Sequence, residues 1–195
     1  MSKEYNNGVG LSQKIMNGVN LLADYTAATL GPRGRNVILQ TAGGTPIITK
    51  DGVTVAKHVE LDDPFENVGA QIIKQASSQT NSSAGDGTTT ATVLAREILE
   101  QSQRYLASGM SPIELKRGMD KAVAAVVINL QDMAQPIKSK EDIAHVATIS
   151  ANNDRTLGEL VATAVDSVGK DGAGTVEKAR SLETSLDLIE GFRFA

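Results

Sequence analysis

The segment Ala84-Gly85-Asp86-Gly87-Thr88-Thr89-Thr90 separates two stretches of helical periodicity. Before it, apolar residues recur every three or four positions from Phe65 to Ala76, and the same spacing resumes at Val93. The sequence therefore predicts a glycine-rich loop directly before the N-terminus of a helix. The free N–H groups at such an N-terminus bind anions, and glycines let the backbone approach a ligand closely.

This loop favours a phosphate ligand accompanied by a cation. Thr88, Thr89 and Thr90 add hydroxyl donors, whereas the Asp86 carboxylate repels a phosphate unless a cation lies between them. Mg²⁺ is the cation that binds through one or two carboxylates together with phosphate oxygens. The residues alone leave open that Asp86 or Thr88 only caps the helix, which contributes about 1 kcal/mol without any ligand.

Two other turns contain similar residues. Leu30-Gly31-Pro32-Arg33-Gly34 ends the helix predicted from Val9 to about Thr29, because glycine allows positive φ and proline stops a helix. In Thr49-Lys50-Asp51-Gly52, Lys50 can neutralise phosphate charge, and Asp51 can bind a metal or orient a water molecule. Taken singly, each segment is more often an ordinary turn with solvated charges.

Other motifs for phosphate and metal chemistry are missing. The sequence has no G-x-x-x-x-G-K-[ST], and Gly85 and Gly87 lack the third glycine of a dinucleotide fingerprint. Haloacid-dehalogenase phosphatases need a nucleophilic Asp two residues before the position of Asp86, and Ala84 stands there. His58 and His145 are isolated in sequence, so we expect structural or surface roles for them.

Composition excludes several kinds of partner. The chain has 195 residues, of which 41% are hydrophobic and 22% charged, as in ordinary globular proteins. Only 3% are aromatic and the formal net charge is −4, which argues against nucleic acid and anionic membranes as partners.

The sequence also predicts where the protein is located. The absence of Cys suits a reducing compartment. No apolar run is long enough to span a bilayer and no secretory signal follows Met1, so we expect a cytoplasmic protein.

The remaining pattern predicts a mainly α fold with small β elements. A short hairpin is expected at residues 37–39 and 47–49, and short strands at 175–177 and 186–189. Residues with helix-capping chemistry open four further helices, namely Asp63, Ser111, Ser139 and the segment Asn152 to Asp154. Gln135-Pro136 ends the helix that Ser111 opens and is the main candidate for a domain boundary.

Three of the predicted helices, at residues 64–76, 93–99 and 112–130, carry apolar stripes that we expect to face a core. The predicted core residues are Phe65, Val68, Ile72, Ile73 and Ala76 in the first, Val93, Leu94, Ile98 and Leu99 in the second, and Ile113, Met119, Val123, Val126, Val127 and Leu130 in the third.

Four segments, in this order, resemble motifs of the group I chaperonins, the GroEL type. They are Thr29-Leu30-Gly31-Pro32-Arg33-Gly34-Arg35-Asn36-Val37, Thr49-Lys50-Asp51-Gly52-Val53, Gly85-Asp86-Gly87-Thr88-Thr89-Thr90-Ala91-Thr92-Val93-Leu94 and Thr148-Ile149-Ser150-Ala151-Asn152. The resemblance is colinear from about Gly8 to Phe194. It implies a subunit of an ATP-driven double ring that assists protein folding and refolding.

The resemblance also implies a domain organisation. A GroEL-like helical equatorial domain that binds ATP would cover residues 1–135, and a small α+β intermediate domain residues 136–190. Residues 191–195 would begin a truncated apical domain. Pro136 and Gly191 match the two hinges. In the complete protein, unfolded polypeptide clients and a co-chaperonin would bind the apical domain of a homo-oligomeric ring, without nucleic-acid or membrane partners.

A binding site for ATP and Mg²⁺ follows from the same resemblance. Asp86 would be the metal ligand and Asp51 the catalytic carboxylate. The residues that would contact the nucleotide and its phosphates are Thr29, Leu30, Gly31, Pro32, Lys50, Asp86, Gly87, Thr88, Thr89 and Thr90.

This sequence also departs from the family pattern. Family chains are much longer, so we expect an N-terminal part or a short relative with little or no ATP turnover and with helices such as 113–130 exposing apolar faces. Arg33 replaces the more usual Lys, and the start at residues 2–7 is divergent. The alternatives are a non-enzymatic module that binds full-length chaperonin rings and a phosphohydrolase of unrelated fold.

Overall fold

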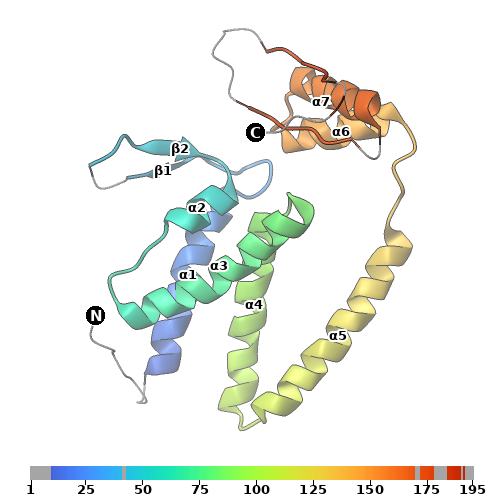
Figure 1. Ribbon diagram of the computed structural model, residues 1–195. Coiled ribbons are helices and arrows are strands. Elements are labelled where there is room, and N and C mark those ends of the chain that lie inside the picture. The colour runs from blue at the N-terminus through green and yellow to red at the C-terminus, as the bar shows by residue number, and fades with distance from the viewer. Residues whose placement is uncertain (1–9, 41–42, 170–171, 178–183, 190, 192–195) are drawn as a thin grey trace. The chain divides into compact units, whose positions relative to one another are not determined.

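The computed structural model describes residues 10–40, 43–169, 172–177, 184–189 and 191. Val9, Asp171, the divergent start at residues 2–7 and the expected apical residues 192–195 lie outside this part of the chain. The chain divides into two compact units, Met1–Ala125 and Val126–Ala195. The described residues form helices and one small antiparallel sheet, so the predicted mainly α fold with small β elements is confirmed (Figure 1).

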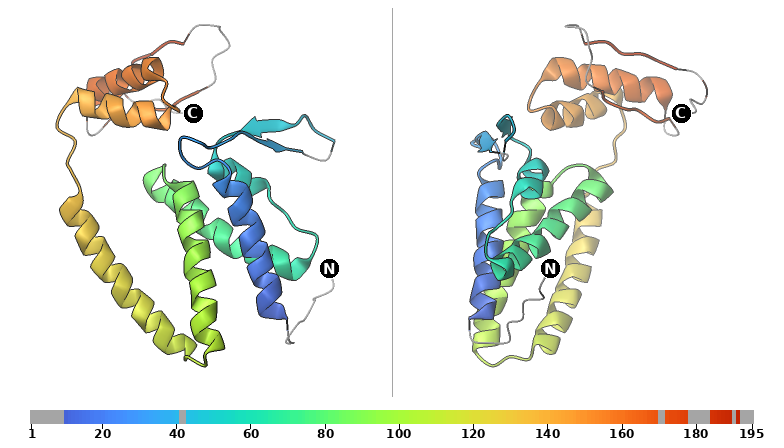
Figure 2. Two further views of the ribbon diagram at one scale, coloured as in Figure 1. Left: turned by 180° about the vertical axis from the view of Figure 1, so that it is seen from behind. Right: turned by 60° about the vertical axis from the view of Figure 1, so that its left-hand side comes forward.

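The first unit is built around three packed helices. They are α1 (Leu11–Ala27), α3 (Pro64–Ala84) and α4 (Thr88–Ala107), and each contacts the other two (Figures 1 and 2). Along the chain, α1 is followed by the hairpin of β1 (Val37–Leu39) and β2 (Ile47–Thr49) and by the short α2 (Gly52–His58), which precede α3. The hairpin was predicted, but α2 was not. The structure adds the register of the hairpin, in which Ile38 lies opposite Ile48.

Helix α3 shows why its ends fall where the sequence places them. The Asp63 carboxylate caps the helix by accepting hydrogen bonds from the amides of Phe65 at 2.9 Å and Glu66 at 3.2 Å, and Pro64 occupies the first turn. At the other end Gly85 has φ +74°, a left-handed conformation that favours glycine. The start at Asp63 and the interruption at the glycine-rich loop were predicted, and both are confirmed, whereas the left-handed cap at Gly85 is a finding of the structure.

Helices α1 and α3 approach each other at the level of their backbones. A Cβ added to Gly18 of α1 would lie 1.8 Å from the carbonyl oxygen of Glu66, and one added to Gly69 of α3 would lie 2.0 Å from that of Ile15. No other residue fits at either position without moving a helix. The core that surrounds this contact consists of Met16, Val19, Leu22, Ala23, Ala56, Val59, Ala70 and Ile73.

The predicted core stripes of α3 and α4 are partly wrong. Val68 and Ile72 of α3, and Leu94 and Ile98 of α4, are all between 45% and 57% exposed. The buried positions of these helices are mainly small or hydroxylic, and they are Gly69, Ala70, Ile73 and Ser77 in α3 and Thr88, Thr92 and Ser102 in α4. Close helix packing selects small residues for the buried face, and the larger apolar residues lie beside it.

Helix α5 (Pro112–Met133) has no buried residue. Of the residues predicted to form its core face, Ile113, Val123, Val126, Val127 and Leu130 are exposed. Met119 is half-buried, and its sulfur lies 3.9 Å from the Ser102 hydroxyl. The prediction of the exposed residues as core is therefore wrong for this chain. The structure agrees instead with the expectation that residues 113–130 expose an apolar face.

The described part of the second unit contains the helix pair α6 (Lys140–Ser150) and α7 (Arg155–Val168), which pack against each other. Ser139 and Asp142 form a capping box on α6, and Asp154 caps α7 through the amide of Leu157 at 3.1 Å. These caps confirm the predicted starts of both helices.

Two predicted strands in this unit are wrong. Residues 175–177 and 186–189 are described but form neither strand nor helix, and Val176 is 94% exposed. A strand needs a hydrogen-bonded neighbour. Within the described residues, the only strand pairing joins β1 to β2.

No helix among the described residues of either unit has the length and apolar content that a bilayer crossing requires.

Truncation of a core side chain tests this packing. Leu22 is fully buried, so we expect Leu22→Ala to lower the free energy of unfolding by about 2–5 kcal/mol. Leu130→Ala in α5, where Leu130 is 59% exposed, is the matched control and should change it by less than about 0.5 kcal/mol. Urea denaturation followed by circular dichroism measures both, and equal losses would contradict the assigned core.

The cap of α3 predicts a pH dependence of stability. The Lys14 ammonium donates to the Asp63 carboxylate, and the amides of Glu66 and Phe65 also donate, which together hold the pKa of Asp63 below its ordinary value of 3.8. Because this pKa is depressed by folding, the stabilisation is present above pH 3.8 and is lost as the pH falls through the lower folded value.

Asp63→Asn keeps a capping side chain but removes this titration, so the melting temperature of the variant should fall less steeply below about pH 4 than that of the wild type. Lys14→Met should reduce the steepness in the same direction because it removes the donor. Thermal melts across this pH range measure the slopes, and an unchanged slope in both variants would refute the assignment.

Candidate functional site

Three loops that are distant in sequence meet at the N-terminus of α4. They are residues 29–35, the first loop; residues 49–52, the second loop; and residues 85–90, the third loop. The hydroxyl oxygens of Thr29 and Thr89 lie 3.4 Å apart, within hydrogen-bonding reach. A Cβ added to Gly52 would lie only 2.1 Å from the Thr89 hydroxyl oxygen. Side chains and backbone from all three loops therefore lie against the first turn of α4.

The first loop is held in a fixed shape by its own backbone. Thr29 is buried and donates its hydroxyl to the carbonyl of Thr26 at 2.8 Å. The amide of Gly34 donates to the carbonyl of Gly31 at 2.9 Å, and the amide of Arg35 to that of Ala28 at 2.8 Å. Gly31 has φ +68°, and Leu30, Gly31 and Pro32 are exposed. The loop thus presents ordered backbone to solvent.

The third loop leaves the N-terminus of α4 open. Gly87 is the N-cap residue, with φ +82°, and no side chain caps the helix. The first amides of a helix have no acceptor within it, so Thr88, Thr89 and Thr90 can direct theirs at a ligand. Thr88 is buried, Thr89 half-buried and Thr90 exposed. The alternative in which Asp86 or Thr88 merely caps α4 is therefore wrong.

Asp86 has the chemistry of a magnesium ligand. Its carboxylate is exposed, and one oxygen accepts from the amide of Gly87 at 2.6 Å. Within the described residues, no three His, Cys, Asp or Glu side chains gather to enclose a metal ion. Mg²⁺ does not need such a cage, because it keeps several waters and uses one or two carboxylates with phosphate oxygens. A single carboxylate beside an open helix N-terminus fits this donor set.

Asp51 is the N-cap of α2, a role that sequence reasoning missed. Its carboxylate accepts from the amides of Val53 at 3.3 Å and Thr54 at 3.0 Å, and from the Thr54 hydroxyl at 2.5 Å. The signal was present, since an Asp directly before a segment without proline can open a helix, and the seven residues of α2 contain none. Lys50 is exposed next to it. Thr54 and Gly52 are therefore additional residues of the second loop and α2 that the motif alone did not single out.

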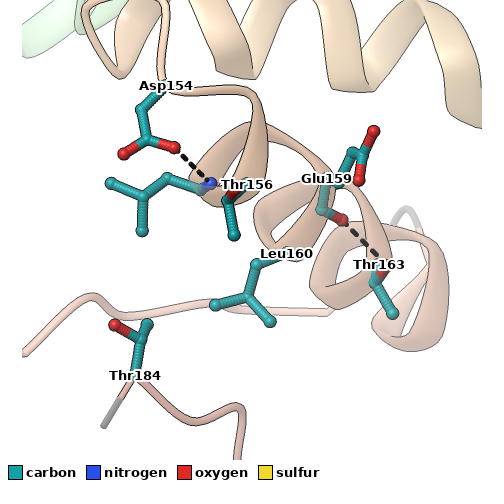
Figure 3. A pocket seen from close by; sticks show the side chains of 7 residues that line it. Asp154, Thr156, Glu159, Leu160, Thr163 and Thr184 are labelled. Atoms are coloured by element: carbon teal, nitrogen blue, oxygen red, sulfur yellow. Dashed lines mark hydrogen bonds between the residues drawn. The ribbon is translucent and has the colours of Figure 1, made fainter.

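The two histidines and a pocket beside α7 in the second unit lie outside this site. His58 and His145 are both exposed. A pocket of about 670 Å³ lies beside α7 and is lined by Asp154, Thr156, Leu157, Glu159, Leu160, Thr163 and Thr184 (Figure 3). Two of its polar side chains bond within α7, since Asp154 caps the helix and Thr163 donates its hydroxyl to the Glu159 carbonyl at 2.8 Å. None of its lining residues comes from the three loops.

A comparison with protein families identifies the family of the chain. The model of the TCP-1/cpn60 chaperonin family matches residues 22–194, which is most of the sequence. The chain belongs to the TCP-1/cpn60 chaperonin family. This membership gives the chaperonin chain a general role in assisting protein folding, with polypeptide clients and oligomeric partners of the general kind that chaperonins have. Chaperonins typically use ATP and are generally ATPases. The alternative of a phosphohydrolase with an unrelated fold is therefore wrong.

The meeting of the first and third loops in this chaperonin chain is directly testable. The sequence contains no Cys, so a pair introduced as Thr29→Cys with Thr89→Cys has no competing thiol. We expect the pair to form a disulfide on mild oxidation, because the replaced hydroxyls lie 3.4 Å apart. Thr29→Cys with Thr90→Cys is the control, since Thr90 is exposed and the next position along a helix lies about 100° around its axis. Peptide mass spectrometry detects the bond, and equal yields in both pairs would contradict the geometry.

Proposed function

We propose that this chain is the ATP-binding N-terminal part of a group I chaperonin subunit, and that its three loops form one site for ATP and Mg²⁺. The observation that supports this most is the contact of Thr29 and Gly52 with Thr89 at an uncapped helix N-terminus. Fixed backbone, an open helix end, a cation and two carboxylates are the groups that a metal-bound triphosphate requires.

Each loop has a distinct task in the proposed site. The phosphates lie at the amides and hydroxyls of Thr88, Thr89 and Thr90, next to the backbone of Gly87. Asp86 holds Mg²⁺, which when bound neutralises phosphate charge. Leu30, Gly31 and Pro32 contact the nucleotide through their exposed backbone, together with Thr29, and Lys50 pairs with phosphate oxygens. These are the residues carried over from the family motifs.

Asp51 is the proposed catalytic carboxylate. A carboxylate has about four acceptor positions, and three hydrogen bonds from Val53 and Thr54 hold this one in place. The remaining capacity suits the orientation of a water molecule beside the terminal phosphate. We expect little or no turnover by the isolated chain, and robust turnover that depends on Asp51 would contradict this part of the proposal.

The domain organisation is also proposed from the family motifs. The equatorial segment covers residues 1–135, the intermediate segment residues 136–190 and the apical start residues 191–195. Two features support the hinges, since α5 ends at Met133 shortly before Pro136, and Gly191 has φ +108°. In the complete cytoplasmic protein, unfolded polypeptide and co-chaperonin bind the apical domain of a homo-oligomeric double ring.

The exposed apolar face of α5 favours an alternative. Side chains such as Val123, Val126 and Leu130 are more than half exposed, and contiguous apolar surface promotes association. In this alternative the chain is a non-enzymatic module that binds full-length chaperonin rings. Co-sedimentation with intact rings in the absence of ATP would favour it, and a monomeric chain that does not sediment with the rings would exclude it.

Loss of the Asp86 carboxylate tests the proposed ATP site. Asp86→Asn should weaken binding of MgATP by about tenfold or more, because the metal loses its carboxylate ligand. Asp132→Asn, which removes an exposed carboxylate from α5, is the matched control and should leave the affinity unchanged. Isothermal titration calorimetry with MgATP, and with ATP in the presence of EDTA, measures both effects. Failure of the wild type to bind MgATP, or equal affinity in Asp86→Asn, would refute the proposal.

A further inference from the structure

Gly52 occupies a position where its backbone does not require glycine. It is the first residue of α2 and is buried. Its φ does not lie in the left-handed region, in contrast to Gly31 and Gly87. Alanine is a better helix former than glycine, so helix formation alone would favour alanine here. The reason for glycine therefore lies in the space around this residue.

That space is closed on two sides by threonines. A Cβ at residue 52 would lie 2.1 Å from the hydroxyl oxygen of Thr89 and 3.2 Å from its Cβ, and also 3.2 Å from Cγ2 of Thr26. Thr26 cannot give way, because it is fully buried in α1 and its hydroxyl donates to the carbonyl of Leu22 at 2.8 Å. An added methyl group must therefore displace Thr89.

Displacement of Thr89 changes the site itself. Threonine has few χ1 rotamers because it is branched at Cβ. A rotation that moves its hydroxyl away from residue 52 also changes the 3.4 Å approach to the Thr29 hydroxyl, which joins the third loop to the first. The other way to make room is a shift of the first turn of α4 away from α2. Both responses alter the groups that face the proposed phosphates.

We infer that Gly52 is a positioning residue of the nucleotide site, which sets the separation between the second loop and the open N-terminus of α4. The inference rests on the proposed function. Lys50 and Asp51 directly precede Gly52 in the chain, so the contact between Gly52 and Thr89 fixes how closely they approach residues 86–90. Because residue 52 has no side chain, the Lys50 ammonium and the carboxylates of Asp51 and Asp86 can act on the same phosphate group.

The nucleotide readout uses Gly52→Ala in the full chain. We expect its Kd for MgATP to rise by about tenfold relative to the wild type, measured by isothermal titration calorimetry. Gly118→Ala in α5 is the matched control, because a Cβ there meets nothing within 4 Å, and its Kd should not change. Ile73→Val lowers core stability away from the site, and its Kd should also stay unchanged. An increase of the same size in Ile73→Val would show a merely structural effect and overturn the inference.

A second readout needs no nucleotide. Hydrogen exchange at the amides of residues 91–93, in the first hydrogen-bonded turn of α4, should be about tenfold faster in Gly52→Ala because that turn is displaced. The double variant Gly52→Ala/Thr89→Ala removes the atom in closest conflict and should recover most of the protection. If the wild type does not bind MgATP, the proposed function fails, and the exchange data then report the contact alone. Unchanged exchange and unchanged affinity in Gly52→Ala would overturn the inference.

Discussion

Helices α1 and α3 touch backbone to backbone because each contributes a glycine at the point of contact. Gly18 lies against the carbonyl of Glu66, and Gly69 against the carbonyl of Ile15. The distance between the two helix axes is therefore set by main-chain atoms rather than by side chains that can repack. The first loop continues from the end of α1, and the third loop from the end of α3. The relative position of these loops follows from the same contact. A glycine allows a similarly close approach where Gly52 meets Thr89.

The sequence predicted local features well, because their causes are local. Asp63, the Ser139 capping box and Asp154 start helices through hydrogen bonds to residues two or three positions away. Burial was predicted less well. An apolar residue such as Ile72 or Ile98 is buried only if a neighbour covers it, and periodicity does not show which side of a helix has a neighbour. The segments at 175–177 and 186–189 are not strands because a strand needs a hydrogen-bonded partner, and alternation of residues does not show whether one is present.

The candidate site shows the same difference between local features, which the sequence predicted, and packing, which it did not. Glycine, proline and threonine patterns identified all three loops, since these residues shape turns and helix ends wherever they occur. That the loops meet is a property of packing, because Thr29 and Thr89 are 60 residues apart in sequence. Helix α2 was missed because its start was interpreted only as a turn with charged side chains. The motif included Gly52 but gave it no role, because that role depends on its distance from the Thr89 hydroxyl.

Asp51 carries a further consequence. A carboxylate that starts a helix is oriented by that helix, without any auxiliary side chain from another element. Its three hydrogen bonds restrict its rotamers in the folded chain, so in the proposed catalytic role little side-chain conformational entropy would remain to be lost. In this chain, the folding of one short helix and the pre-organisation of an acidic group are the same event.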